Sequence, residues 1–92
     1  MKTKLSTKQQ QELKAKAHHL KPVVMIGDKG LTENILTEVD IALTSHELIK
    51  VKINGADRDQ RNAIAEEISE KSEACLVQMI GRILVLYRKR PD

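Results

Sequence analysis

Aromatic side chains are almost absent from this 92-residue chain, which has one tyrosine, Tyr87, and no phenylalanine or tryptophan. Proteins that read splayed single-stranded bases normally stack them on several aromatic side chains. The composition therefore excludes a base-stacking reader of the RRM or OB type. Any contacts to nucleic acid should be mainly to phosphate and sugar. Tyr87 itself is expected to pack within the last strand.

Cysteine and long apolar runs are also scarce. The single cysteine, Cys75, excludes an internal disulfide, which suits a reducing cytoplasm. The longest apolar runs, 23–26 and 83–87, are far shorter than the roughly 20 residues that span a bilayer. No apolar signal segment follows Met1, so no secretory signal is visible. We expect a soluble cytoplasmic protein.

Catalytic and metal-binding groupings are missing as well. The tetrapeptide 27–30 is not a phosphate-binding P-loop, because the long glycine spacing and the Lys-Ser/Thr pair are absent. The glutamates of 66–73 are expected to be solvated, and Cys75 to be a buried structural thiol. The chain has three histidines, His18, His19 and His46, and none of them stands at a metal-ligand spacing from the lone cysteine. We predict no catalysis, no cofactor and no metal.

Charge is distributed unevenly along the chain, whose net charge is +3. Residues 1–30 carry seven lysines against two acidic residues, whereas residues 31–80 carry five basic and ten acidic groups. Residues 81–92 are basic again. This polarity fits a molecule that presents one basic side to an anionic partner. From charge alone, an ordinary solvated surface remains an equal alternative.

Apolar periodicity and capping residues predict three helices and four strands. A capping box at Ser6 begins a helix over 6–19. Thr32 and Asp57 are typical N-caps of two further helices. Strands are expected at 23–26, 48–53, 75–80 and 83–87, with a two-residue hairpin turn at 81–82.

The resulting order, α-β-α-β-α-β-β, predicts an α/β fold in a single compact domain over residues 1–92. Two crossovers and a final hairpin give a mixed four-stranded sheet with helices packed on it. The strands at 23–26 and 83–87 are apolar on both faces, so we expect helices on both sides of part of the sheet. Lys50 and Lys52 predict that the second strand has one less covered face.

The tetrapeptide Gly27-Asp28-Lys29-Gly30 lies between the first strand and the second helix. Glycines let the backbone pass close to a bulky ligand, and the N–H groups of a helix start attract anions. Alone, a GxxG is more often a plain tight turn. Lys29 and the following helix favour contact with a nucleic-acid backbone. Asp28 would repel a phosphate unless it turns away, for instance to cap the next helix.

The first predicted helix has a basic flank. Helical spacing places Lys14, His18 and Lys21 on one side of its apolar stripe and His19 on the other. We expect the first flank to run toward the strand that leads into the glycine loop, a geometry that allows a continuous basic surface. Solvated lysines, or an interaction of the histidines with the helix dipole, remain open as alternatives.

Several stretches together resemble the CRM domain family, and more closely its stand-alone bacterial, YhbY-like members. These stretches are residues 20–24, the glycine loop with Leu31-Thr32-Glu33, residues 46–53 and residues 78–88. The resemblance covers nearly the whole chain in the same order. It implies an α-β-α-β-α-β-β fold and RNA binding. Bacterial members of the family associate with precursors of the large ribosomal subunit, and plant relatives act in organellar intron splicing.

The resemblance also implies which residues contact RNA. The family's GxxG loop matches Gly27, Asp28, Lys29 and Gly30, and its basic first helix matches the segment that contains Lys14, His18 and Lys21. The family often has neutral or basic residues between the glycines. The acidic Asp28 departs from that pattern, which leaves Lys29 as the better candidate.

The function implied is that of a monomeric ribosome-assembly factor that binds structured ribosomal RNA of the pre-large ribosomal subunit, with an assembly protein as an optional partner and no membrane. A competing hypothesis is a protein-interaction adaptor that uses the acidic second and third helices as its docking surface. A hybrid would place the basic side on RNA and the acidic side on an assembly protein.

Overall fold

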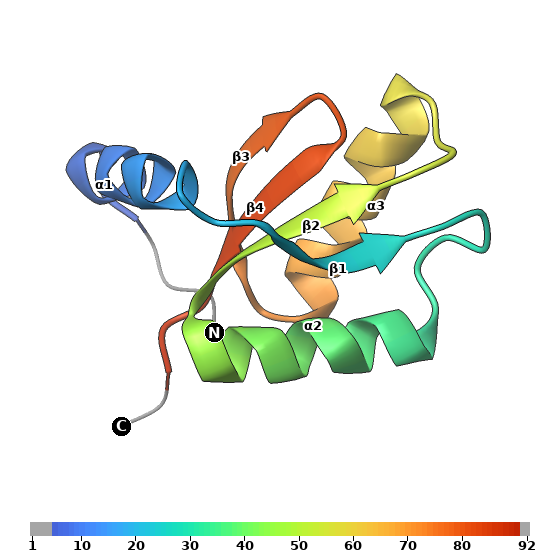
Figure 1. The fold of residues 1–92 in the computed structure, drawn as a ribbon, viewed down its shortest axis with the longest axis horizontal. Helices are drawn as coiled ribbons and strands as arrows, with labels where there is room; N and C mark the ends of the chain where they lie inside the picture. Colours follow the sequence, from blue (N-terminus) through green and yellow to red (C-terminus); the bar gives the residue numbers. More distant parts are fainter. Residues whose placement is uncertain (1–4, 91–92) are drawn as a thin grey trace.

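A computed structural model describes residues 5–90 and has three helices and four strands (Figure 1). The elements are α1 (Thr7–Ala17), β1 (Pro22–Ile26), α2 (Glu33–His46), β2 (Leu48–Ile53), α3 (Arg58–Lys71), β3 (Cys75–Ile80) and β4 (Ile83–Tyr87). The predicted order and fold class are confirmed. The first helix is shorter than predicted, because it ends at Ala17 with His18 as its C-cap.

Side-chain caps set the starts of all three helices. Ser6 Oγ accepts from the amide of Gln9 at 3.1 Å, and Gln9 Oε1 accepts from the amide of Ser6 at 2.9 Å. Asp57 forms the same reciprocal capping box at the start of α3. Thr32 Oγ1 accepts from the amide of Ile35 at 3.2 Å. These bonds satisfy amides that have no partner inside the helix, so the helix starts follow from local sequence.

The sheet has the strand order β1-β2-β4-β3. The β1–β2 pair is parallel, and the β2–β4 and β3–β4 pairs are antiparallel. The predicted mixed sheet is therefore confirmed, with β2 and β4 at its centre. The tight β3–β4 turn uses Gly81 at a φ of 57°, a left-handed conformation that glycine adopts readily.

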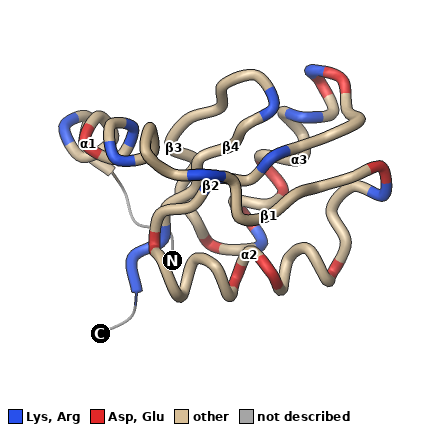
Figure 2. The backbone as a smooth tube through the Cα atoms, in the orientation of Figure 1, with Lys and Arg blue, Asp and Glu red and all other residues tan. Residues whose placement is uncertain are grey.

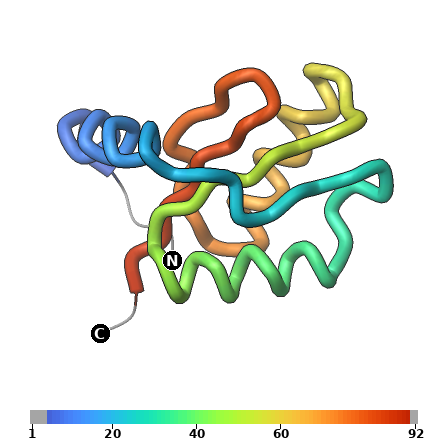
Figure 3. Tube along the Cα trace, viewed as in Figure 1, coloured from blue at the N-terminus to red at the C-terminus, as the bar shows by residue number. Residues whose placement is uncertain are grey.

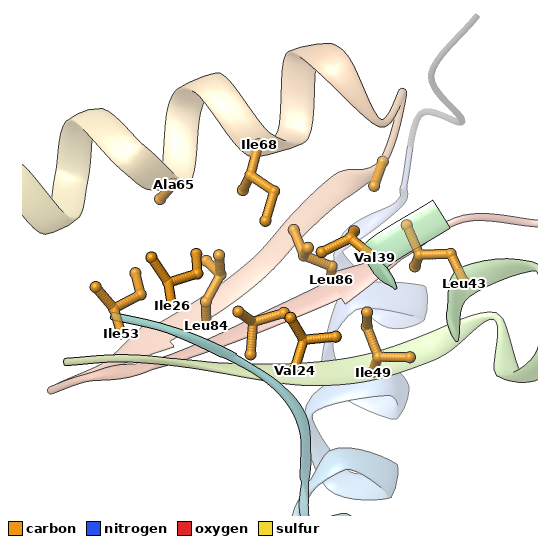
Figure 4. Close-up of a cluster of buried hydrophobic side chains, with 12 residues drawn as sticks. Val24, Ile26, Val39, Leu43, Ile49, Ile53, Ala65, Ile68, Leu84 and Leu86 are labelled. Atoms are coloured by element: carbon orange, nitrogen blue, oxygen red, sulfur yellow. The ribbon is translucent and has the colours of Figure 1, made fainter. Parts of the chain in front are cut away.

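The main core lies between one face of the sheet and the helices α2 and α3 (Figure 4). Its fully or nearly fully buried side chains include Val24, Ile26, Ile49, Ile53, Leu84 and Leu86 from the sheet and Val39, Leu43, Ala65 and Ile68 from the helices. Burial of these aliphatic side chains provides most of the driving force for folding.

The opposite face of the sheet is covered only in part. Leu13 and Ala17 of α1 pack on Val77 and Val85, and Tyr87 packs against the same cluster, as predicted. α1 contacts β2, β3 and β4. A helix about 10 Å wide cannot cover all four strands at a spacing of about 4.8 Å, and Met25 on the edge strand β1 stays exposed on this face.

The expectation that helices lie on both sides of part of the sheet is confirmed, because α2 and α3 cover one face and α1 covers part of the other. The two strands that are apolar on both faces differ in their cover. Leu84, Val85 and Leu86 of β4 are all buried, whereas Val23 and Met25 of β1 are 53% and 58% exposed. The less covered face predicted for β2 is also present, since Lys50 and Lys52 are half-buried on it.

Candidate nucleic-acid interface

A row of side chains crosses the part of the sheet that α1 leaves open. Met25 pairs with Lys52, Lys52 with Ile83, and Ile83 with Ile80 in the strand register. Directly paired residues project to the same face, so these four residues, with Lys50, define the open sheet face. Met25 and Ile80 are exposed at the two edges of the row. A lysine therefore lies between apolar side chains that solvent can reach.

The basic flank of α1 borders this open sheet face. Lys14 and His18 line a hollow of about 190 Å³ together with Lys50 of β2 and Gln78 of β3. The structure thus brings together two of the residues predicted for RNA contact and adds a second lysine, from the sheet. Figure 2 shows basic segments on α1, on β2 and at the β3–β4 turn.

Sequence reasoning did not include Lys50 and Lys52 among the site residues. Their alternation with buried Ile49 and Val51 predicted an exposed face. These two lysines were missed because their role depends on tertiary packing, and no local pattern shows which part of the sheet the first helix covers. Two cations on one face of an otherwise apolar central strand were the available signal.

Lys21 lies apart from Lys14 and His18. The chain turns after α1, where the amide of Leu20 donates to the carbonyl of Ala17 at 3.0 Å. Lys21 then lines a different hollow. The predicted placement of Lys21 on the same flank is wrong because the helical spacing used to place it ends at His18.

The glycine loop is a tight turn that precedes α2. The amide of Gly30 donates to the carbonyl of Gly27 at 3.0 Å, and Gly30 has a φ of +71°. Asp28 and Lys29 are exposed. α2 begins at Glu33 with Thr32 as its N-cap, so the helix start is separated from the loop. A Cβ added at Gly27 would meet nothing within 4 Å, which leaves that backbone open to a ligand.

The carboxylate of Asp28 turns toward the β2–α3 loop and does not cap α2. A Cβ built on Gly55 would lie 2.5 Å from Asp28 Oδ1. The same two loops are joined by the amide of Asn54, which donates to the carbonyl of Ile26 at 2.8 Å. Asp28 therefore lies against a neighbouring loop although it is exposed, and Lys29 is the exposed positive charge of the turn.

The glycine loop and α1 lie at opposite ends of β1 (Figure 1). The trace in Figure 3 shows the same arrangement, with the β1–α2 turn projecting away from α1. The expected basic surface therefore does not pass directly from α1 to the loop. A path between them crosses the open sheet face, where Lys50 and Lys52 supply its positive charge.

Acidic residues gather along α2 (Figure 2). On α3, Lys71 Nζ lies 2.8 Å from Glu67 Oε2. The hydrogen bond to Glu67 and its charge raise the pKa of Lys71.

Cys75 is half-buried, whereas a buried thiol was expected. Among residues 5–90, no group of three or more His, Cys, Asp or Glu could hold a metal ion, and no helix there is long and apolar enough to span a membrane.

Comparison with known proteins identifies the family. The CRS1/YhbY (CRM) domain matches residues 5–88, and the chain belongs to this family. It is 58% identical over 86 residues to a Haemophilus influenzae protein named as RNA-binding, covering 94% of this chain and 87% of that protein. A probable RNA-binding protein of Pseudomonas aeruginosa is 46% identical over 87 residues, covering 95% of this chain and 84% of that protein.

The fold is shared with a solved structure. The solution structure of a hypothetical protein from Staphylococcus aureus matches with a TM-score of 0.85 and 36% identity, covering 97% of this chain and 93% of the other. The resemblance to the CRM family that the sequence motifs indicated is therefore confirmed.

Proposed function

We propose that this protein binds structured RNA through the open sheet face and the adjoining flank of α1. The convergence of Lys14, His18 and Lys50 around one hollow is the observation that carries this proposal. Cations from two separate elements at one site suit the phosphate backbone of a folded RNA. The relatives named as RNA-binding proteins give independent support.

The glycine loop provides a second contact in this proposal. β1 separates it from α1, and five residues of strand span about 16 Å. Lys29 and the open backbone at Gly27 would approach one stretch of phosphate while Lys14 and Lys50 approach another. An RNA that touches both must have a fixed shape, which favours structured RNA over a flexible single strand.

The proposed RNA is ribosomal RNA of the pre-large ribosomal subunit, and the proposed role is assistance in assembly of that subunit in the cytoplasm. The CRM membership of the chain supports this assignment. Phosphate contacts fix the position of a protein on a shaped RNA and carry little sequence information, which suits an assembly factor that acts at one site in a particle.

A cell extract fractionated on a sucrose gradient tests the role. We expect the protein to migrate with precursors of the large subunit, and to leave them after nuclease treatment or in high salt, because its phosphate contacts weaken as salt rises.

Ile41 is an exposed apolar residue on the acidic helix α2, which is what a protein-interaction adaptor would use. Co-migration with a protein after complete RNA digestion would favour that adaptor.

A further inference from the structure

A second hollow, of about 500 Å³, lies on the other flank of α1. Its volume falls within the range of sites that hold small organic ligands. It is bounded by the C-terminal end of α1, the start of β1 and the connection from α2 to β2. Its apolar lining consists of Leu13, Leu20, Val23, Leu48, Ile49 and the aromatic Tyr87.

Basic side chains surround this apolar lining. They are Lys16, His19, Lys21 and His46. The one acidic residue is Glu47, whose Oε2 accepts from the amide of Arg90 at 2.8 Å and lies 3.8 Å from Arg90 Nε. The negative charge of Glu47 is thus already matched, and the hollow presents a positive rim to an entering group.

We propose that this hollow holds one unpaired nucleotide of the bound RNA. A nucleobase is a flat group whose faces suit the apolar lining with Tyr87, and its phosphate suits Lys16 and Lys21 at the rim. The site takes a single base, in contrast to the multi-aromatic platforms that the composition excludes. This inference rests on the proposed RNA-binding function and deepens it.

The two hollows adjoin at the end of α1. His18 lines the one beside the open sheet face, and its neighbour His19 lines the nucleotide hollow. An RNA strand bound by the first hollow therefore reaches the second by passing around the C-terminal end of the helix. This route also gives Lys21 a role, because its side chain lies on the far side of α1 from Lys14.

Titration of the isotope-labelled full chain with the four nucleoside 5′-monophosphates tests the proposal, with ribose 5-phosphate as the control that has the phosphate but no base. We expect NMR shifts around His46, Leu48 and Tyr87 with at least one nucleotide. Ribose 5-phosphate should bind about tenfold more weakly, because it lacks the stacking of a base. Equal shifts with both compounds would reveal a simple phosphate site and overturn the proposal.

A matched pair of variants locates the base. Val23→Glu places a carboxylate in the hollow and should weaken nucleotide binding about tenfold. Ile41→Glu on α2 is the control, because Ile41 is similarly exposed but lines neither hollow and lies outside the open sheet face. The same spectra report folding, and Leu20→Glu, outside any strand, replaces Val23→Glu if that variant unfolds. Unchanged nucleotide binding in the folded hollow variants overturns the proposal.

Binding of a ribosomal RNA fragment, measured in parallel, separates this inference from the proposed function. Tight, salt-dependent RNA binding without nucleotide shifts overturns the nucleotide hollow alone. Nucleotide shifts in a protein that binds no RNA would overturn the proposed function, and with it the claim that the nucleotide belongs to a bound RNA.

Discussion

Arg88 Nη1 donates a hydrogen bond to Asp40 Oδ1 at 2.8 Å and so ties the end of β4 to the middle of α2. The same guanidinium donates to the carbonyl of Ser72 at 2.8 Å and to Thr44 Oγ1 at 3.0 Å. Its side chain is only 21% exposed. Although Arg88 lies in the basic C-terminal stretch, it is a brace between a strand and two helices and has little capacity left for an RNA phosphate.

Arg88→Ala should therefore lower stability and leave RNA affinity nearly unchanged. Hydrogen bonds that involve a charged group contribute more than neutral ones, and the loss of several at once should cost about 2 kcal/mol. Urea unfolding measures this change. Arg90→Ala is the matched control, because Arg90 is 55% exposed and pairs with Glu47 only at 3.8 Å. It should cost less than about 1 kcal/mol. Equal losses for the two variants would contradict the brace.

Gly27→Ala tests the glycine loop without disturbing the fold. Gly27 is not among the residues with positive φ, and an added Cβ meets no atom within 4 Å. Stability should stay within about 0.5 kcal/mol. RNA affinity should fall if phosphate approaches this backbone closely, since a Cβ would hold it away. If filter binding shows that the variant has wild-type affinity for RNA, Gly27 is not part of the interface.

Gly30→Ala is the companion variant, and it separates strain from contact. Gly30 has a φ of +71°, although an added Cβ there also meets nothing. The left-handed backbone should cost an alanine about 1 kcal/mol. The pair thus predicts a stability loss at Gly30 and an affinity loss at Gly27, which thermal unfolding and RNA titration distinguish.

Local sequence patterns were sufficient for the elements and their order. The capping box at Ser6 and the alternation around Lys50 and Lys52 each involve neighbours only a few residues apart, so the sequence displays them directly. The placement of α1 on the sheet depends on contacts between distant parts of the chain, such as Leu13 with Val85. No periodicity carries that information.

Individual residues of the candidate site were therefore predicted from the sequence, but their arrangement in space was not. Lys14 and His18 share a hollow because they lie one turn apart, Lys14 in the last turn of α1 and His18 at its C-cap. Lys21 was misplaced because the helix ends before it. Asp28 was expected to repel a phosphate unless it turned away, and its carboxylate does turn away, to lie against Gly55, 27 positions further along. Contacts of that kind become visible only when the fold is known.

Lys50→Ala should weaken RNA binding and lower the dependence of affinity on salt. Each phosphate contact contributes about 0.9 to the slope of log affinity against log salt, so the slope should fall by about one. Lys71→Ala is the control, because Lys71 is paired with Glu67 on α3. Titrations of one ribosomal RNA fragment at several salt concentrations give both slopes. An equal effect of the two variants would indicate that only net charge matters.

Gly55→Ala tests whether the Asp28 carboxylate positions the glycine loop. The added Cβ would lie 2.5 Å from Asp28 Oδ1, and Gly55 has a φ of +74°. The variant should therefore lose stability both from backbone strain, at about 1 kcal/mol, and from displacement of Asp28. Because Asp28 and Lys29 share one turn, RNA affinity should fall as well.

A double-mutant cycle divides these two effects. Removing the carboxylate with Asp28→Ala relieves the steric conflict but leaves the strain at position 55, so the double variant should be more stable than the sum of the two single losses predicts. Denaturant unfolding of the four proteins measures this coupling. Strictly additive losses would mean that the Asp28 side chain moves away without cost, and that packing against Gly55 does not hold the loop in place.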